Sequence, residues 1–297
     1  MKIKNILLLC ACIFICAKAA THENSQSKKK EITITIWVHG SNITPDLILR
    51  NFFYHQKGMV NALQYRSPRY HARVIAEVLS EADPKKYQME NFYFYGWSGA
   101  LCYDKREETA RSLYLAILEL KNIYSKKYPN TDLKIRIITH SHGGNVALNL
   151  CPAQKNDTPL IIDELIMLAA PVQLATKDLA QNSCFKKIYS FYSGTDLYQI
   201  LDFQRVRKKR RTLKIYSERR FDEFDNVRQA KVKLNCWSLM HIEFLLKKFL
   251  RHLPLLTKEL DALYDSLDDN AKKREKLLHI KSDRKGNAYI RTKVFRR

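Results

Sequence analysis

The chain has 297 residues, of which 45% are hydrophobic and 28% charged, and this composition excludes a wholly disordered chain and a coiled-coil rod. Its apolar runs are all shorter than the roughly 20 residues that a membrane-crossing helix needs, which excludes a polytopic membrane protein. Lysine and arginine number 52 against 30 for aspartate and glutamate, a formal net charge of +22.

The N-terminal residues 1–19 have the three-part composition of a Sec signal peptide. Lys2 and Lys4 precede an apolar stretch at 6–17, and small residues then suit cleavage before Ala20. A basic start, a short apolar core and a small-residue cut site are the features that direct a chain into export. We therefore expect a mature protein that is periplasmic or secreted.

A lipid anchor is the alternative reading of the same segment. Residues 9–12 (LCAC) resemble a lipobox, which would make Cys12 a lipidated residue. In either case the polar residues 20–30 are expected to form a linker.

Four cysteines follow the signal segment: Cys102, Cys151, Cys184 and Cys236. An oxidising compartment would allow two disulfides among them, and four cysteines permit three pairings. Buried free thiols are the alternative. The spacing of the four cysteines does not suggest a metal site. It also does not indicate which cysteines pair, so the disulfide pairing stays open.

Residues 31–252 alternate between segments rich in β-forming residues and segments of helical period. Strands are expected at 32–38, 92–96, 133–139, 165–170, 188–192, 213–217 and 230–234. Helices are expected at 69–82, 104–121 and 145–150. Helices between strands imply crossover connections, so we expect an α/β domain with a mostly parallel sheet covered on both faces. A basic helical extension is expected over 253–297.

The turn after the strand at 133–139 carries the residues that point to catalysis. Residues 139–144 read THSHGG and are followed by a helical pattern. A serine between a strand and a helix, followed by small residues, is typical of a nucleophile elbow, which exposes the hydroxyl above the sheet edge. The alternative is that Ser141 belongs to an ordinary glycine-rich turn or a phosphate-binding turn.

A nucleophilic serine needs a base to take its proton and a carboxylate to orient that base. Asp196 and His241 each follow a later expected strand, which places them at the same edge of a parallel sheet. Asp202 is an alternative acid without the strand-then-turn context, and His252 is an alternative base within the expected last helix.

These segments resemble the α/β-hydrolase family, particularly its lipase and esterase members. The elbow departs from the family pattern G-x-S-x-G at its first position, where this chain has Thr139. The chain order serine, acid, histidine is that of the family. The resemblance covers about residues 32–250 and implies a three-layer α/β-hydrolase fold, reduced at its N-terminal strands because no early antiparallel strands are recognisable.

The resemblance also implies an oxyanion hole. The strand at 32–38 ends in His39-Gly40, and in the family the residue after this glycine lends its backbone N–H. Carried over, the two donors are the N–H groups of Ser41 and His142.

The implied reaction is ester hydrolysis through an acyl-serine intermediate. Ser141 would be the nucleophile, His241 the general base and then acid, and Asp196 the residue that orients the imidazole. This chemistry needs no metal and no organic cofactor, and the substrate would be a small-molecule or lipid ester.

The positive charge is concentrated in two segments. Residues 205–220 have a net charge of +8 and residues 271–297 of +9, together 17 of the 22. Such segments suit contact with an anionic membrane or envelope surface. The alternative function is a non-catalytic basic protein that binds anionic lipid, envelope polymer or nucleic acid. Nucleic acid is disfavoured because the sequence has no recognisable reading element.

Overall fold

The computed structural model describes residues 30–41, 57–64, 71–154, 157–199, 218–235, 237–282 and 287–295. Within these ranges ten strands form a single sheet in the order β10-β9-β7-β6-β5-β4-β1-β3-β2, with β8 paired to β7. The bounds are β1 (Lys30–Val38), β2 (Gly58–Asn61), β3 (Phe92–Gly96), β4 (Thr131–His140), β5 (Glu164–Leu168), β6 (Ile188–Tyr192), β7 (Val227–Leu234), β8 (Trp237–Ser238), β9 (Lys276–Ser282) and β10 (Ala288–Val294).

The sheet is mostly parallel. Only the pairs β2–β3, β7–β8 and β9–β10 are antiparallel among the described strands. Strand β1 lies between β3 and β4, and its register with β4 matches Val38 to Thr139. The carboxyl ends of β1 and β4 therefore meet at one edge of the sheet, where α/β folds usually bind their ligands.

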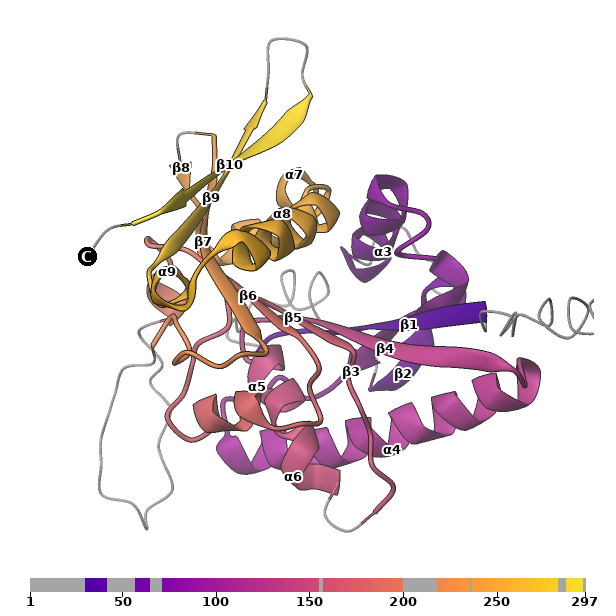
Figure 1. Cartoon of the computed structure of the whole chain (residues 1–297). Coiled ribbons are helices and arrows are strands. Elements are labelled where there is room, and N and C mark those ends of the chain that lie inside the picture. The colour runs from indigo at the N-terminus through magenta and orange to yellow at the C-terminus, as the bar shows by residue number, and fades with distance from the viewer. Residues whose placement is uncertain are drawn as a thin grey trace, which may run out of the picture.

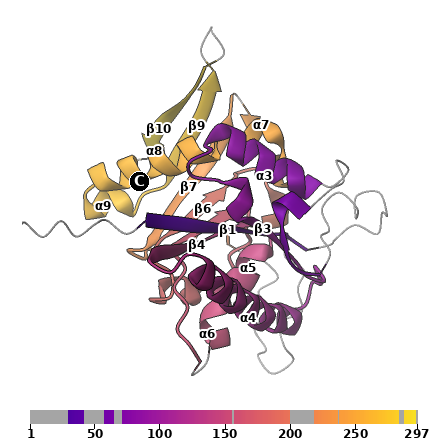
Figure 2. The same cartoon turned by 90° about the vertical axis from the view of Figure 1, so that its right-hand side faces the viewer.

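Helices cover both faces of the sheet, which gives three layers (Figures 1 and 2). One face carries α4 (Tyr103–Lys127), α5 (Gly143–Leu148) and α6 (Leu150–Gln154). The other carries α3 (His71–Ala82), α7 (Lys247–Leu250) and α8 (Leu253–Ser266), and α9 (Asp269–Lys272) follows α8. Short 3-10 helices complete the connections: η1 (Ala62–Gln64), η2 (Met89–Asn91), η3 (Lys177–Gln181), η4 (Leu197–Gln199) and η5 (His241–Leu245).

Each face of the sheet has its own hydrophobic core because side chains alternate along a strand. In β1, Ile34 and Ile36 join the core beneath α4, whereas Trp37 joins the core beneath α3 and α8. In β4, Ile137 packs in the core beneath α4, and Ile138 packs in the core beneath α3 and α8. Since central strands are buried on both faces, they read as continuous apolar runs in the sequence.

The α/β class and the mostly parallel sheet agree with the expectation from the sequence. The strands at 92–96 and 188–192 have the expected bounds, and the others that fall in the described ranges shift by a few residues. The strand expected at 213–217 lies outside the described residues.

The C-terminal prediction is wrong for residues 276–294. The segment expected to be a helical extension begins with α8 and α9, but β9 and β10 then extend the sheet. Strand β9 pairs in parallel with β7 and buries Leu278 and Ile280 at alternate positions. Two such residues are enough to seat the strand against the core, while the basic residues between and after them stay near the surface.

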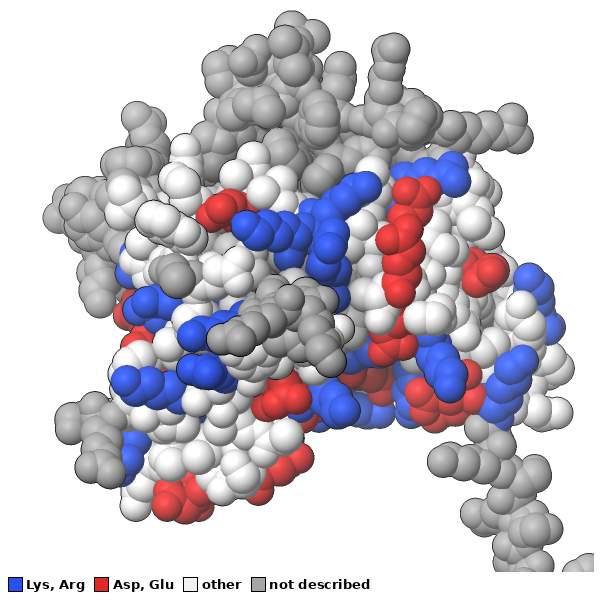
Figure 3. Space-filling view, turned by 90° about the horizontal axis from the view of Figure 1, so that it is seen from above, with Lys and Arg blue, Asp and Glu red and all other residues white. Residues whose placement is uncertain are grey.

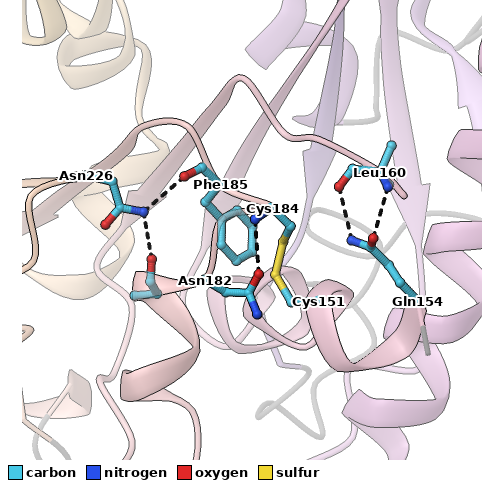
Figure 4. Close-up of a disulfide and its surroundings, with 8 residues drawn as sticks. Cys151, Gln154, Leu160, Asn182, Cys184, Phe185 and Asn226 are labelled. Carbon is cyan, nitrogen blue, oxygen red and sulfur yellow. Dashed lines mark hydrogen bonds between the residues drawn. A yellow bond between two sulfur atoms is a disulfide. The ribbon is translucent and has the colours of Figure 1, made fainter. Parts of the chain in front are cut away.

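A disulfide joins Cys151 of α6 to Cys184, 33 residues later (Figure 4). Around it, Asn182 Oδ1 accepts the N–H of Cys184, and the Asn226 amide donates to Phe185 O. Cys102 is a free, exposed thiol, and Cys236 lies outside the described residues. None of the helices in the described ranges has the length and apolar character needed to cross a bilayer.

Candidate active site

Ser141 occupies the sharp turn between β4 and α5. Its φ of 52° lies in the left-handed region, a conformation that costs free energy in a non-glycine residue and is common at functional sites. The turn is held on both sides: Ser141 N–H donates to Leu168 O at 2.9 Å, and Ser141 O accepts from Gly144 N–H at 3.0 Å. A strained serine between a strand and a helix is what the expected nucleophile elbow requires of the backbone.

Two glycines let α5 begin immediately after this turn. A Cβ on Gly143 would lie 2.5 Å from Val38 O, at the end of β1. A Cβ on Gly144 would lie 2.9 Å from Ala170 Cβ, just beyond β5. No other residue could bring the helix this close to the strand ends, so the small residues after Ser141 are a packing requirement.

Gly40 brings the end of β1 against the elbow. A Cβ on Gly40 would lie 2.8 Å from Ser141 Cβ and 3.1 Å from His140 O. The backbone of the expected oxyanion loop therefore touches the residue expected to be the nucleophile. Ser41 follows in the chain, and its Oγ is buried with no hydrogen-bond partner in the described part of the structure.

Asp196 and His241 form a direct pair. Asp196 Oδ2 lies 2.8 Å from His241 Nδ1, and the Asp196 side chain is fully buried while that of His241 is 13% exposed. The other carboxylate oxygen accepts the N–H of Gln199 at 3.3 Å. A carboxylate accepts a proton-bearing nitrogen, so in neutral His241 the proton is on Nδ1 and Nε2 is the basic nitrogen.

Three further contacts hold the loop that carries His241. Thr195 Oγ1–H donates to Leu239 O at 3.1 Å, and Met240 N–H donates to Glu243 Oε2 at 2.6 Å. His140 Nε2 lies 3.0 Å from His241 O. In the described residues no hydrogen bond joins the Ser141 hydroxyl to His241, and such contacts commonly tighten only when substrate is bound.

The ring of His39 joins the end of β1 to the end of β3, a role that the residue pattern does not indicate. Trp97 N–H donates to His39 Nε2 at 3.2 Å, so the ring proton is on Nδ1, 2.7 Å from Gly40 O. Trp97 Nε1–H donates in turn to His39 O at 2.8 Å. Burial lowers the pKa of His39 to about 4, with only partial compensation from the two backbone hydrogen bonds. A neutral His39 therefore ties Gly40 to the end of β3.

The ring of His142 lies against a buried arginine. Arg106 is 1% exposed, and its Nη1 lies 3.4 Å from His142 Nδ1. The amide nitrogen of Asn145 lies 3.3 Å from the same His142 atom. Because both neighbours are donors, Nδ1 is an acceptor and the proton of neutral His142 is on Nε2. Nothing in the sequence spacing singles out Arg106, since the contact depends on where α4 packs.

The alternative residues fall elsewhere. Asp202 lies outside the described residues. His252 precedes the first residue of α8, and none of its described contacts involves Ser141 or Asp196. Within the described ranges there is no group of three or more His, Cys, Asp or Glu residues arranged to hold a metal ion.

No protein-family model matches the chain, and no curated protein sequence matches it. Two structures of the phospholipase PlaB from Legionella pneumophila are similar at 14% identity. The complex with thio-NAD has a TM-score of 0.32 and matches 89% of this chain and 49% of PlaB. The second has a TM-score of 0.29 and matches 90% of this chain and 51% of PlaB. This chain spans about half the length of PlaB.

Proposed function

We propose that this protein is a serine hydrolase that cleaves carboxylic esters through an acyl-serine intermediate. The observation that carries the proposal is the 2.8 Å contact between Asp196 and His241 at the same sheet edge as Ser141, whose φ is 52°. A left-handed serine between strand and helix, at the same sheet edge as a histidine oriented by a buried carboxylate, suits the activation of a hydroxyl as a nucleophile.

The reaction would proceed in two halves. His241 Nε2 takes the proton of Ser141 as Oγ attacks the ester carbonyl, and the bond from carbon to the alcohol oxygen then breaks as His241 returns the proton to the leaving alcohol. In the second half His241 takes a proton from water, hydroxide attacks the acyl carbon, and Ser141 Oγ leaves with that proton. Asp196 stays ionised and stabilises the imidazolium in both halves.

The developing negative charge on the carbonyl oxygen needs fixed donors. We assign these to the backbone N–H groups of Ser41 and His142. The assignment is supported by Gly40, whose contact with Ser141 brings the β1 loop beside the elbow, and by His142, which directly follows the nucleophile in the chain. Removing one such donor typically costs about 100- to 1,000-fold in turnover.

A lipid ester is the substrate class that the surroundings of His241 favour. Large apolar side chains are exposed on the segments that carry His241 and Asp196: Tyr198, Trp237, Met240, Ile242 and Leu246. Tyrosine and tryptophan are enriched at the interface between membrane and water. One face of the molecule carries many Lys and Arg side chains, with Asp and Glu between them (Figure 3), and such cations attract anionic headgroups.

We also propose that the protein is exported by the Sec route and is periplasmic or secreted. The Cys151–Cys184 disulfide supports this, because such bonds persist mainly in oxidising compartments. The test is to express the full chain, fractionate the cells and sequence the N-terminus of the stable product. A protein that starts at Ala20 and is found outside the cytoplasm is expected, whereas an uncleaved cytoplasmic product would contradict export.

Labelling with a fluorophosphonate probe tests the catalytic proposal. The probe reacts only with an activated serine, so we expect stoichiometric labelling of the purified protein and none of Ser141→Ala. The Ser141→Ala variant should also lose hydrolysis of p-nitrophenyl butyrate while its thermal midpoint changes little. Turnover that survives in purified Ser141→Ala would remove the nucleophile assignment.

A further inference from the structure

The side chain of His140 lies between the two loops that carry the proposed reaction. It is 7% exposed at the end of β4, directly before Ser141. On one side, a Cβ on Gly40 would lie 3.2 Å from His140 Nδ1. On the other, the ring centroids of His140 and His241 are 4.6 Å apart at an interplanar angle of 53°. One imidazole thus contacts both the oxyanion loop and the residue proposed as base.

The contact with His241 is directional. His140 Nε2 lies 3.0 Å from the backbone carbonyl oxygen of His241. A carbonyl oxygen can only accept, so the ring must carry its proton on Nε2 and donate it. His241 is therefore held at two points: Asp196 fixes its ring through Nδ1, and His140 fixes its backbone.

This second point of attachment ties the base to the nucleophile. His140 and Ser141 are consecutive residues of the same turn, and Ser141 N–H is itself bonded to Leu168 O. The hydrogen bond from His140 therefore sets where the His241 backbone lies relative to the Ser141 backbone. Further polar contacts of the loop that carries His241 come from the loop of Asp196 and from η5 itself, and Phe244 and Leu245 pack η5 into the core. None of these contacts joins His241 to the turn of Ser141.

We infer that His140 is a positioning residue for the reaction: its Nε2–H fixes the backbone of His241 and thereby the reach of the base to Ser141. The inference rests on the proposed function, because it assumes that His241 acts on Ser141. A displacement of about 1 Å in a reacting group can cost about 100-fold in rate. The loss should therefore appear in kcat, while KM, which reports substrate contacts elsewhere, changes little.

Three variants separate the hydrogen bond from the volume of the ring. In His140→Gln the amide nitrogen reaches about as far as Nε2 and restores the donor. In His140→Asn the same amide is one carbon shorter and does not reach His241 O. His140→Phe keeps the ring and removes the donor. With p-nitrophenyl butyrate as substrate, we expect kcat to fall about 10- to 100-fold in the Asn and Phe variants. The Gln variant should retain most of the kcat of the parent protein.

Two further readouts exclude a merely structural effect. The rate of fluorophosphonate labelling should fall in the same order as kcat, because it reports activation of Ser141. The downfield proton resonance of the His241–Asp196 hydrogen bond should broaden in His140→Asn and sharpen again in His140→Gln. As a control, the thermal midpoint of each variant should stay well above the assay temperature, so that a loss of kcat does not reflect a loss of folded protein.

The outcomes distinguish this inference from the function on which it rests. Equal kcat in the Gln and Asn variants, whether both high or both low, contradicts the positioning role, and so does a change confined to KM. If Ser141→Ala is inactive while His140→Asn is fully active, the proposed function stands and the role of His140 is overturned. If Ser141→Ala retains turnover, the proposed function fails first.

Discussion

The absence of a side chain at Gly40 lets the proposed oxyanion loop approach the turn of Ser141. An added Cβ would lie 2.8 Å from Ser141 Cβ and 3.1 Å from the backbone oxygen of His140. Neither neighbour can move without disturbing the turn, so Gly40→Ala should push the loop outward. We expect kcat for p-nitrophenyl butyrate to fall about 100-fold, with only a small change in the thermal midpoint.

Gly194→Ala is the matched control for this variant. Its Cβ would meet only the Cε and Nζ atoms of Lys231, which are the far end of a flexible side chain. Turnover of Gly194→Ala should stay near that of the parent protein. If both glycine variants lose activity to the same extent, close packing at Gly40 is not the cause.

His39 makes the stability of the folded state depend on pH. Its folded pKa of about 4 lies below the ordinary value of 6.5, so the unfolded chain binds a proton that the folded one excludes. The stability due to neutral His39 is full above pH 6.5 and is lost as pH falls toward 4, by about 3 kcal/mol in all. Urea unfolding at a series of pH values measures this loss.

His39→Gln supplies the comparison. Glutamine does not titrate, so the variant should be less stable at pH 7, and its stability should fall less steeply than that of the parent between pH 6.5 and 4. Parallel pH curves for the two proteins would show that His39 titrates normally in the folded state.

The site residues divide into those that chain position can indicate and those that it cannot. The sequence predicts Ser141, Asp196 and His241 as candidate catalytic residues because each follows a strand. Parallel strands bring their carboxyl ends together at one edge of the sheet. His140 and Arg106 could not be predicted in this way, because their contacts depend on the direction of one side chain at the sheet edge and on the packing of α4. The sequence shows that these two residues are present, but it does not show which side chains they contact in the folded protein.

Elements were readable from the sequence where burial was complete. Strands β3 and β6 are short runs rich in aromatic residues with no exposed position. Short apolar runs of this kind are typical of buried strands. Strands β9 and β10 mix lysine and arginine with a few apolar residues because only part of β9 is buried. Their composition alone resembles a solvated helix, and pairing with β7 is a tertiary effect.

The disulfide joins α6 to the loop that precedes β6. It closes a loop of 33 residues, for which loss of unfolded-chain entropy predicts a stabilisation of about 3–4 kcal/mol. We expect Cys151→Ser and Cys184→Ser to lower the free energy of unfolding in urea by this amount. Cys102→Ser is the control, because that thiol is free and exposed, and its unfolding curve should not move.

Over the whole molecule, positive charge and exposed apolar residues suggest contact with an anionic lipid surface. We predict that the protein binds vesicles containing phosphatidylglycerol and is released as salt rises, since charges in water are screened over about 8 Å at physiological ionic strength. Trp237→Ala removes the most exposed large apolar side chain near His241. It should weaken vesicle binding without changing turnover of a soluble ester.

Neutralising residues 207–211, which lie outside the described ranges, tests the basic segment in the same assay. Weaker vesicle binding with normal ester turnover is expected. If turnover falls as well, the segment contributes to the site itself, and if neither changes, its charge serves only solubility.

The position of β1 in the sheet has a consequence for the order in which the protein can fold. This strand comes first in the described chain, yet it is central, and it pairs with β4 from Lys30↔Thr131 onward, about a hundred residues later. Pairings between such distant segments slow folding, because a long loop must close before any contact is gained. During synthesis one edge of β1 can pair with β3 once residues 92–96 have been made, but the other edge stays unpaired until β4 is complete at residue 140. This late closure would suit the proposed export, because a chain passes through a translocation channel before its sheet has formed.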